Sequence, residues 1–307
     1  MRARRSLIDL DDLEPAEVDY IFKRTESFEE KLPPRRALAG IACVNLFFEQ
    51  STRTITSFML AEQRLGADII TLTPKDTSLG KGESIEDSAI TLAAMGVKLL
   101  VIRHSEAGFP RRVAMAFDGH VVNAGDGPHA HPTQALLDVY TLRKEFGELT
   151  GRRIAIVGDI LHSRVAHSNI QGLKNLGAQI TLCGPPVFLP DSFEEEGVRV
   201  ERDFDSVLPE ADAIILLRIQ RERFTHAPGI ISDDEYIRGY RLDAARLARL
   251  REETIIMHPG PYNRGVELED DVLQYAGWRY ANQVRHGVFV RMAILDFLVN
   301  GQQKTKA

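Results

Sequence analysis

Residues 40–66 read GIACVNLFFEQSTRTITSFMLAEQRLG, and this stretch decides the fold class. The apolar run 40–48 predicts a buried strand. After it, Ile55, Phe58, Met59 and Leu65 recur at helical spacing, and Gly66 stands where a helix would stop. A buried strand that leads directly into a helix is the repeating unit of a parallel sheet covered by helices.

The same alternation continues along the chain. Strands are predicted over 67–74, 97–104, 120–125, 151–159, 179–185, 211–220 and 254–260, and helices over 84–96, 131–147, 163–177 and 242–253. The pattern predicts an α/β protein with two doubly wound parallel-sheet domains and the active site in the cleft between them. The expected domains are 1–150 and 151–285, with a C-terminal helix, 286–300, that packs back on the first.

Composition narrows the function classes. The 307 residues carry a net charge of −6, which argues against a general nucleic-acid binder. No apolar stretch reaches the roughly 18 residues needed to span a bilayer, and the N-terminus lacks a secretory signal, so a cytoplasmic protein without membrane contact is expected. Cys43 and Cys183 lie in apolar strand-like runs, which favours buried free thiols. No metal-binding motif is present, so neither a metal nor a cofactor is expected.

The segment FFEQSTRT, residues 47–54, places polar residues where a strand ends and a helix begins. The helix N-terminus offers unpaired N–H groups, to which Ser51, Thr52 and Thr54 add hydroxyls and Arg53 adds a guanidinium. These donors predict a phosphate site. The alternative is an ordinary Ser/Thr helix cap with a surface arginine. The segment is not a GxxxxGK[ST] loop, so no nucleotide is implied.

Other predicted strands also end in polar residues. Arg103 ends one strand, His131 opens a helix, and HPGPYNRG, residues 258–265, follows the last strand. Singly, Arg103 could be a surface charge and His131 a capping residue. Together they place donors on the same side of the sheet as Ser51, because ligands bind beyond the carboxyl ends of parallel strands.

In the second half, Arg164 follows the strand 151–159, while Arg218 and Gln220 close the strand 211–220. An arginine at the end of a buried strand requires a partner or a ligand, so the alternative for both arginines is an internal salt bridge. The GxGxxG fingerprint is absent, which disfavours NAD. Arg53 and Arg103 could neutralise a phosphate, and Arg164 with Arg218 could clamp two carboxylates. No nucleophilic Ser or Cys with an adjacent base is visible.

The motifs FFEQSTRT, SLGKGES, VIRH, HPTQALLD, GDILHSRVAHSN, RIQRER and HPGPYNRG occur in an order that resembles the aspartate/ornithine carbamoyltransferase family, over about residues 5–300. In the second half the chain resembles the aspartate branch, since it lacks the Ser-Met-Gly and His-Cys-Leu-Pro motifs of the ornithine branch. The resemblance implies transfer of the carbamoyl group from carbamoyl phosphate to the α-amine of L-aspartate, which gives N-carbamoyl-L-aspartate and phosphate in de novo pyrimidine biosynthesis.

The resemblance also implies site roles. Domain 1–150 would bind carbamoyl phosphate and domain 151–285 would bind aspartate. Catalytic roles fall to Arg53, Thr54, Lys81, Arg103, His131 and Gln134. The carbamoyl-phosphate site would comprise these residues with Ser51, Thr52, Ser78, the Pro259 carbonyl, Gly260 and Pro261, and the aspartate site would comprise Lys81, Arg164, Arg218 and Gln220.

The resemblance further implies a homotrimer with shared active sites, in which Ser78 and Lys81 reach in from a neighbouring subunit. The resemblance leaves open a larger assembly with regulatory chains or with dihydroorotase. Two departures stand out: Ile55 replaces an arginine that is frequent in relatives, and Gly260 replaces a leucine. The alternatives are a transcarbamylase for ornithine or another amino acid, and a catalytically silent scaffold subunit.

Overall fold

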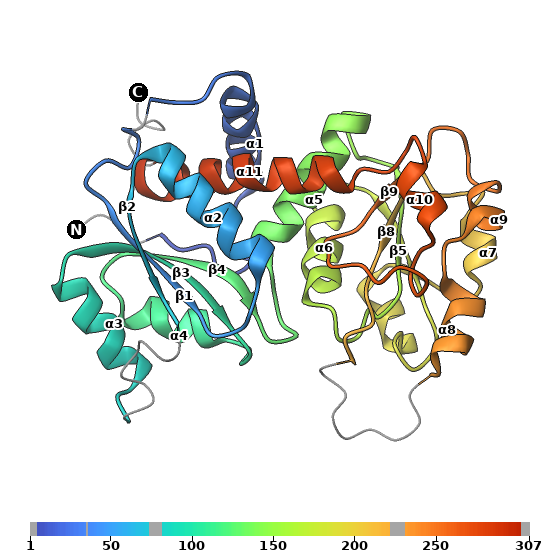
Figure 1. Cartoon of the computed structure of the whole chain (residues 1–307), viewed down its shortest axis with the longest axis horizontal. Coiled ribbons are helices and arrows are strands. Elements are labelled where there is room, and N and C mark those ends of the chain that lie inside the picture. The colour runs from blue at the N-terminus through green and yellow to red at the C-terminus, as the bar shows by residue number, and fades with distance from the viewer. Residues whose placement is uncertain (1–4, 35, 74–81, 222–230, 302–307) are drawn as a thin grey trace. The chain divides into compact units, whose positions relative to one another are not determined.

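The structure, a computed structural model, describes residues 5–34, 36–73, 82–221 and 231–301 (Figure 1). The chain divides into two compact units, one formed by residues 1–140 with 284–307 and the other by residues 141–283. Each unit contains one sheet in which every strand pair is parallel. This arrangement confirms the predicted fold class of two doubly wound α/β domains.

The sheet of the first unit has the strand order β2-β1-β3-β4. Its strands are β1 (Ala42–Phe47), β2 (Asp68–Leu72), β3 (Val97–His104) and β4 (His120–Asp126). The chain runs from β1 outward to β2, then returns to the other side of β1 for β3 and β4. The carboxyl ends of β1 and β3 therefore flank the point where the winding changes direction, which is where open α/β sheets bind ligands.

Within the described residues, six helices contribute to the first unit. They are α1 (Pro15–Glu30), α2 (Thr52–Leu65), α3 (Ile85–Ala94), α4 (Phe109–Ala116), the first part of α5 (Pro132–Phe146) and most of α11 (Tyr280–Asn300), with a short 3₁₀ turn η1 (Leu10–Asp12). Glu62 of α2 accepts a hydrogen bond from Asn45 Nδ2 at 2.8 Å, so α2 covers the face to which Asn45 points. Ile85 and Phe109 cluster with Val44 on the opposite face, because neighbouring strand residues point in opposite directions.

Local signals set the helix ends as the sequence predicts. Gly66 follows α2 with a φ of 84°, a left-handed conformation that glycine adopts without strain. Ser84 caps α3 by accepting from the Asp87 amide at 3.0 Å, and Pro132 is the first residue of α5.

The C-terminal helix α11 begins at Tyr280, earlier than the predicted 286. Asp296 of α11 accepts from Arg24 Nε of α1 at 2.7 Å, and the rings of Tyr20 and Phe297 are 5.7 Å apart. Helix α11, in red, accordingly lies beside α1, in dark blue (Figure 1). Residues from the end of the chain thus complete the first unit.

The sheet of the second unit has the order β7-β6-β5-β8-β9. Its strands are β5 (Arg153–Val157), β6 (Gln179–Cys183), β7 (Arg199–Glu201), β8 (Ala213–Leu216) and β9 (Ile255–Met257). The helical segments are α6 (Arg164–Lys174), η4 (Asp191–Glu196), α7 (Phe204–Val207), α8 (Asp233–Tyr240), α9 (Ala244–Leu247) and α10 (Asp270–Gln274). Here the winding changes direction between β5 and β8, so the loops after these strands form the second expected ligand site.

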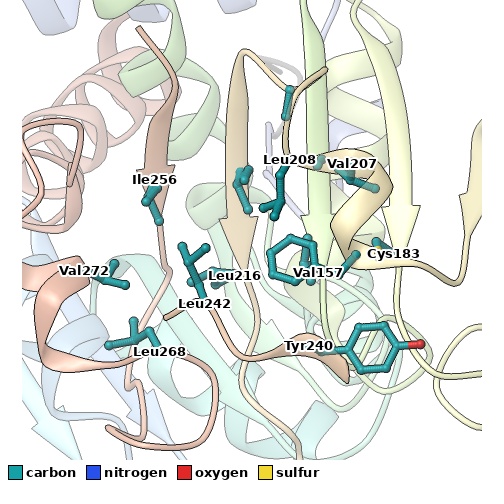
Figure 2. Close-up of a cluster of buried hydrophobic side chains, with 14 of the residues drawn as sticks. Val157, Cys183, Val207, Leu208, Leu216, Tyr240, Leu242, Ile256, Leu268 and Val272 are labelled. Atoms are coloured by element: carbon teal, nitrogen blue, oxygen red, sulfur yellow. The ribbon is translucent and has the colours of Figure 1, made fainter. Parts of the chain in front are cut away.

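A buried apolar cluster holds the helices of the second unit against its sheet (Figure 2). Val157, Leu216 and Ile256 project from β5, β8 and β9 toward side chains of the covering segments. Cys183 belongs to the same cluster, and burial raises the pKa of its thiol to about 12. Cys183 and Cys43 are both buried and free, which confirms the prediction for the two thiols.

Several elements are shorter in the structure than the sequence predicts. Strand β8 ends at Leu216, so Arg218 and Gln220 lie in the loop that follows and do not close the strand. The helix predicted over 242–253 is limited to Ala244–Leu247. Its later arginines are engaged in ion pairs with acids from other segments, as Arg249 Nη1 with Asp205 shows at 2.5 Å.

Candidate active site

The first polar loop lies at the carboxyl end of β1. Ser51 immediately precedes α2, and its side chain makes no capping hydrogen bond with the helix. The alternative of an ordinary serine cap is therefore not what the structure shows. Thr54 is buried, whereas Thr52 and Arg53 are exposed, and Arg53 forms no ion pair with another described residue. The first turn of α2 thus presents hydroxyl, guanidinium and amide donors together.

Arg103 stands next to this loop, because β1 and β3 are neighbours and Phe47 is paired with Arg103 in the sheet. Its Nε lies 3.3 Å from Glu49 Oε2, and its Nη1 donates to the Ala124 carbonyl at 3.3 Å. The side chain of Arg103 is only 14% exposed. Glu49 therefore holds a largely buried cation beside the first turn of α2.

A fixed loop after β4 carries His131. Asp126 is fully buried, and it accepts from the amides of Gly108 at 2.8 Å and Ala130 at 3.1 Å, and from Asn123 Nδ2 at 2.8 Å. This carboxylate closes the loop between β4 and α5. His131 is buried, and its carbonyl accepts from the amide of Gln134 at 3.0 Å, so the histidine occupies the start of α5.

Gln134 lies one turn into α5, and its Nε2 donates to Asp138 Oδ1 at 2.9 Å. Both residues are buried. The Gln134 side chain is thus held by Asp138 on the same helix, since residues four apart share one helix face.

The second unit repeats this arrangement at its own switch point. Asp159, just after β5, is fully buried. It accepts from the amide of Gln220 at 3.0 Å and from the amide of His162 at 3.2 Å, and its Oδ1 lies 2.9 Å from His162 Nδ1. One carboxylate therefore links the loop after β5 to the loop after β8.

Three of the predicted aspartate ligands lie in the described residues. Arg218 and Gln220 are in the loop after β8, and Arg164 directly follows the loop after β5. Arg164 is the first residue of α6 and is 6% exposed, after Ser163, whose hydroxyl accepts from the Ala166 amide at 3.2 Å. Arg218 Nη2 donates to Gln220 Oε1 at 3.3 Å. Arg218 thus contacts Gln220, the other predicted aspartate ligand of this loop.

The positive charge of Arg218 acts on a buried acid of the second unit, Glu267. Burial raises the pKa of Glu267 above its usual value, and the positive charge of Arg218 counteracts this rise. The Glu267 carboxylate also accepts from the Asn263 amide at 2.7 Å. Arg218 therefore has an acidic neighbour as well as a position at the sheet edge.

Two side chains hold the backbone of the segment after β9. The His258 amide donates to Gln283 Oε1 at 2.8 Å, and the Gly260 amide donates to His258 Nδ1 at 2.8 Å. The peptide bond between Gly260 and Pro261 is cis. The two hydrogen bonds fix the backbone of residues 258–260 beyond the end of β9.

The described residues contain no group of three or more His, Cys, Asp or Glu side chains placed to hold a metal ion. No described helix combines the length and the apolar character needed to cross a membrane.

Comparison with known proteins decides the family. Residues 5–144 match the aspartate/ornithine carbamoyltransferase carbamoyl-P binding domain, and residues 150–298 match the Asp/Orn binding domain of the same family. The chain belongs to the aspartate/ornithine carbamoyltransferase family.

Relatives from bacteria carry the name of the aspartate branch. The aspartate carbamoyltransferase catalytic subunit of Acidothermus cellulolyticus is 51% identical over 278 residues, which cover 91% of this chain and 85% of the relative. The catalytic subunit from Chloroflexus aggregans is 47% identical over 302 residues, with 95% and 97% covered.

Solved structures agree with the sequence matches. Aspartate transcarbamoylase from Trypanosoma cruzi, in complex with N-(phosphonacetyl)-L-aspartic acid, superposes with a TM-score of 0.84 at 30% identity, over 95% of this chain and 94% of that one. The catalytic subunit of M. jannaschii aspartate transcarbamoylase gives a TM-score of 0.84 at 31% identity, with 98% and 99% covered.

Most predicted site residues of this carbamoyltransferase lie at the carboxyl edge of one or the other sheet. In the first unit they follow β1 and β4, and Arg103 lies near the end of β3. In the second unit they follow β5, β8 and β9. Ser78 and Lys81 lie outside the described residues. The predictions from the sequence do not include the acids that hold these residues or their loops, which are Glu49, Asp126, Asp138 and Asp159. An acidic residue directly after a buried strand, as in Val-Gly-Asp at 157–159, is the signal that could have indicated Asp159.

Proposed function

We propose that the residues at the two switch points carry the two substrates of one transfer reaction. The chain is an enzyme that transfers the carbamoyl group of carbamoyl phosphate to the α-amine of L-aspartate in pyrimidine synthesis, the reaction for which its relatives are named. The observation that carries the residue assignment is the placement of cations and donors at the carboxyl ends of the strands that flank each change of winding.

In the first unit, the proposed phosphate ligands are Ser51, Thr52, Arg53 and Thr54. The exposed Arg53 and the uncapped first turn of α2 offer the planar fork and the amide donors that a phosphate takes. Thr54 is buried beside them.

Arg103, His131 and Thr54 are proposed to donate to the carbonyl oxygen of the carbamoyl group. Donors fixed in advance at a developing oxyanion lower the barrier more than donors that must reorganise. Arg103 is held by Glu49, and the loop of His131 is held by Asp126. His131 is proposed to act as a neutral donor and not as a general base.

In the second unit, Arg164, Arg218 and Gln220 are proposed to bind the two carboxylates of aspartate. Guanidinium groups bind carboxylates in a bidentate manner, and their charge would repel the side-chain ammonium of ornithine. Asp159 supports this assignment because it fixes the Gln220 amide to the loop that leads to Arg164.

The reaction needs no covalent enzyme intermediate. The neutral α-amine of aspartate attacks the carbonyl carbon and forms the new C–N bond. The tetrahedral intermediate then collapses, the bond from carbon to the phosphate oxygen breaks, and phosphate leaves with the amine proton. The role of the protein is to orient both substrates and to stabilise the oxyanion.

Gln134, the Pro259 carbonyl, Gly260 and Pro261 are proposed to hold the carbamoyl amide. Ser78 and Lys81 are proposed to complete the site from a neighbouring copy, so that a homotrimer is the active unit. The proposed compartment is the cytoplasm, in keeping with the two free buried thiols.

A matched pair of arginine variants tests the assignment. Arg53 opens α2 and Arg64 lies in its last turn, so Arg53→Ala and Arg64→Ala remove the same charge from opposite ends of one helix. Titration with a bisubstrate analogue that joins a phosphonate to aspartate should show tight binding to the wild type and to Arg64→Ala. Binding to Arg53→Ala should be weaker by about a hundredfold or more, as expected when a charge-assisted bidentate contact is lost.

The second unit offers the same comparison. Arg218→Ala should weaken the analogue, while Arg199→Ala, which removes a surface arginine paired with Glu201 and Glu210, should not. Equal binding by Arg53→Ala and the wild type would contradict the phosphate site. Faster turnover with ornithine than with aspartate would contradict the assignment of the acceptor.

A further inference from the structure

Two buried charged side chains lie on helices of the first unit. Arg291, on α11, is 4% exposed, and its Nη1 donates to the Gly287 carbonyl at 3.2 Å. Its guanidinium lies over the ring of Phe58 on α2, 5.0 Å from the ring centroid. Asp138, on α5, is fully buried. Burial lowers the pKa of Arg291 to about 10, and the negative charge of Asp138 acts against this shift.

Asp138 in turn touches a residue of the proposed site. Its Oδ1 accepts from Gln134 Nε2 at 2.9 Å. An ionised carboxylate can only accept hydrogen bonds, so it draws the nitrogen end of the glutamine amide toward itself. The amide is planar, and its oxygen Oε1 is therefore the end directed away from Asp138.

We propose that Asp138 is a positioning residue that fixes the amide of Gln134, so that Oε1 accepts a hydrogen bond from the NH₂ group of the substrate. This inference rests on the proposed function, in which Gln134 contacts the carbamoyl group. The fixed amide would then make the site selective for an acyl phosphate that carries a nitrogen donor over one that carries a methyl group in its place.

The ionisation of Asp138 decides which end of the amide it holds. A protonated Asp138 could donate to Oε1, which would turn the amide around and present its NH₂ group to the substrate NH₂ group. Two donors cannot pair. A positive charge in the same unit, that of the buried Arg291, favours the ionised form of a carboxylate over the protonated form.

The experiment compares carbamoyl phosphate with acetyl phosphate, which has a methyl group where the carbamoyl group has NH₂. Carbamoyl phosphate is followed by kcat/KM at saturating aspartate, and acetyl phosphate by its inhibition constant against carbamoyl phosphate. In Asp138→Asn, kcat/KM should fall about tenfold or more, because an incorrectly oriented amide leaves a polar group unpaired. The inhibition constant of acetyl phosphate should change by less than about threefold, since its methyl group makes no hydrogen bond with Oε1.

Asp296→Asn is the matched control. Asp296 is also a buried carboxylate of the first unit, paired with Arg24 at 2.7 Å, and it contacts none of the proposed site residues in the described structure. It should lower stability without altering the preference for carbamoyl phosphate. The double variant Asp138→Asn/Gln134→Ala should discriminate no worse than Gln134→Ala alone, because the two residues act in series.

The double variant Asp138→Asn/Arg291→Met covers the case in which Asp138→Asn does not fold, since it removes both buried charges together. It should show the same loss of discrimination. Equal losses for carbamoyl and acetyl phosphate, or a loss in Asp296→Asn that matches Asp138→Asn, would overturn the proposal. Failure of the proposed function is distinguishable, because the wild type itself would then not convert carbamoyl phosphate and aspartate.

Discussion

Asp159→Asn is expected to weaken the binding of aspartate while leaving the binding of carbamoyl phosphate unchanged. Asp159 is fully buried after β5, and its two oxygens accept from different loops: Oδ1 from the His162 amide at 3.2 Å and Oδ2 from the Gln220 amide at 3.0 Å. Asparagine has one acceptor and one donor at these positions. One of the two amides must therefore face an NH₂ group.

The expected magnitude follows from the lost contacts. A hydrogen bond to a charged group contributes about 1.5–3 kcal/mol, and a buried amide without a partner costs roughly 1–3 kcal/mol. The substitution should lower the free energy of unfolding by about 2–4 kcal/mol after partial rearrangement of the loop. Displacement of Gln220, with Arg218 two residues before it, should raise the KM for aspartate about tenfold, which corresponds to about 1.4 kcal/mol of lost binding.

The assay is steady-state kinetics with each substrate varied in turn, together with urea unfolding of the full chain. Asp212→Asn is the control. Asp212 precedes β8 at the opposite, amino edge of the same sheet, where it accepts from the Arg153 amide at 2.8 Å. Burial opposes its ionisation, but hydrogen bonds from Arg153 and Arg251 outweigh this and hold its pKa below the usual value.

Asp212→Asn should therefore reduce stability without changing the KM for aspartate. If Asp159→Asn lowers stability but leaves the KM for aspartate within about twofold of the wild type, the link between this carboxylate and the site is refuted. A similar rise in KM in Asp212→Asn would refute it as well, since the effect would then follow from general destabilisation.

Three further substitutions test other parts of the first unit. Burial raises the pKa of Glu62 above 4.5, so its stabilising contribution is complete below that pH and is lost as the pH rises through the raised value; urea unfolding should thus show the wild type losing stability relative to Glu62→Gln as the pH rises from 4.5 to about 8. Asp126→Ala releases the loop that carries His131, and kcat should fall about tenfold or more in saturating assays, whereas an unchanged kcat would show that the loop is held by other contacts. In Gly287→Ala the new Cβ would lie 2.8 Å from Arg291 Nη1, so urea unfolding should show a loss of about 1–3 kcal/mol, together with weaker discrimination against acetyl phosphate.

The parts of the fold that depend on local sequence were predictable. The strand–helix unit 40–66 is correct because the apolar spacing, the polar start at Ser51 and the stop at Gly66 all act within a few residues of each other. The start of α5 at Pro132 follows from the fixed backbone of proline in the same way.

Elements shaped by distant partners were not predictable. The helix predicted over 242–253 ends at Leu247, and Arg251 contacts Asp212, 39 residues earlier in the chain. Tertiary contacts of this kind, which the sequence does not specify locally, decide where that helix ends. Helix α1 is a different case: it is absent from the prediction, although Pro15 at its first position and the buried Ile21 and Phe28 at helical spacing provide a local signal.

The candidate site shows the same division. The side chains proposed to contact the substrates could be named from the sequence, because each lies at the end of a predicted strand or in the segment that follows it. The carboxylates that hold them could not, since Asp159 and Gln220 are 61 residues apart and become neighbours only when β5 and β8 pair. Asp138 was hidden for another reason: one turn beyond Gln134, on an amphipathic helix, it has the spacing of an ordinary polar residue.

The position of α11 has a consequence for synthesis on the ribosome. Residues 141–283 are continuous, whereas the unit that begins the chain also requires residues 284–307. The second unit therefore has all its residues available first, and the earlier one keeps an uncovered face until residues 284–307 have been synthesised. A nascent chain that stalls before residue 284 would display the apolar surface that Val290, Ile294 and Leu298 normally cover, which makes it a target for chaperones or proteases.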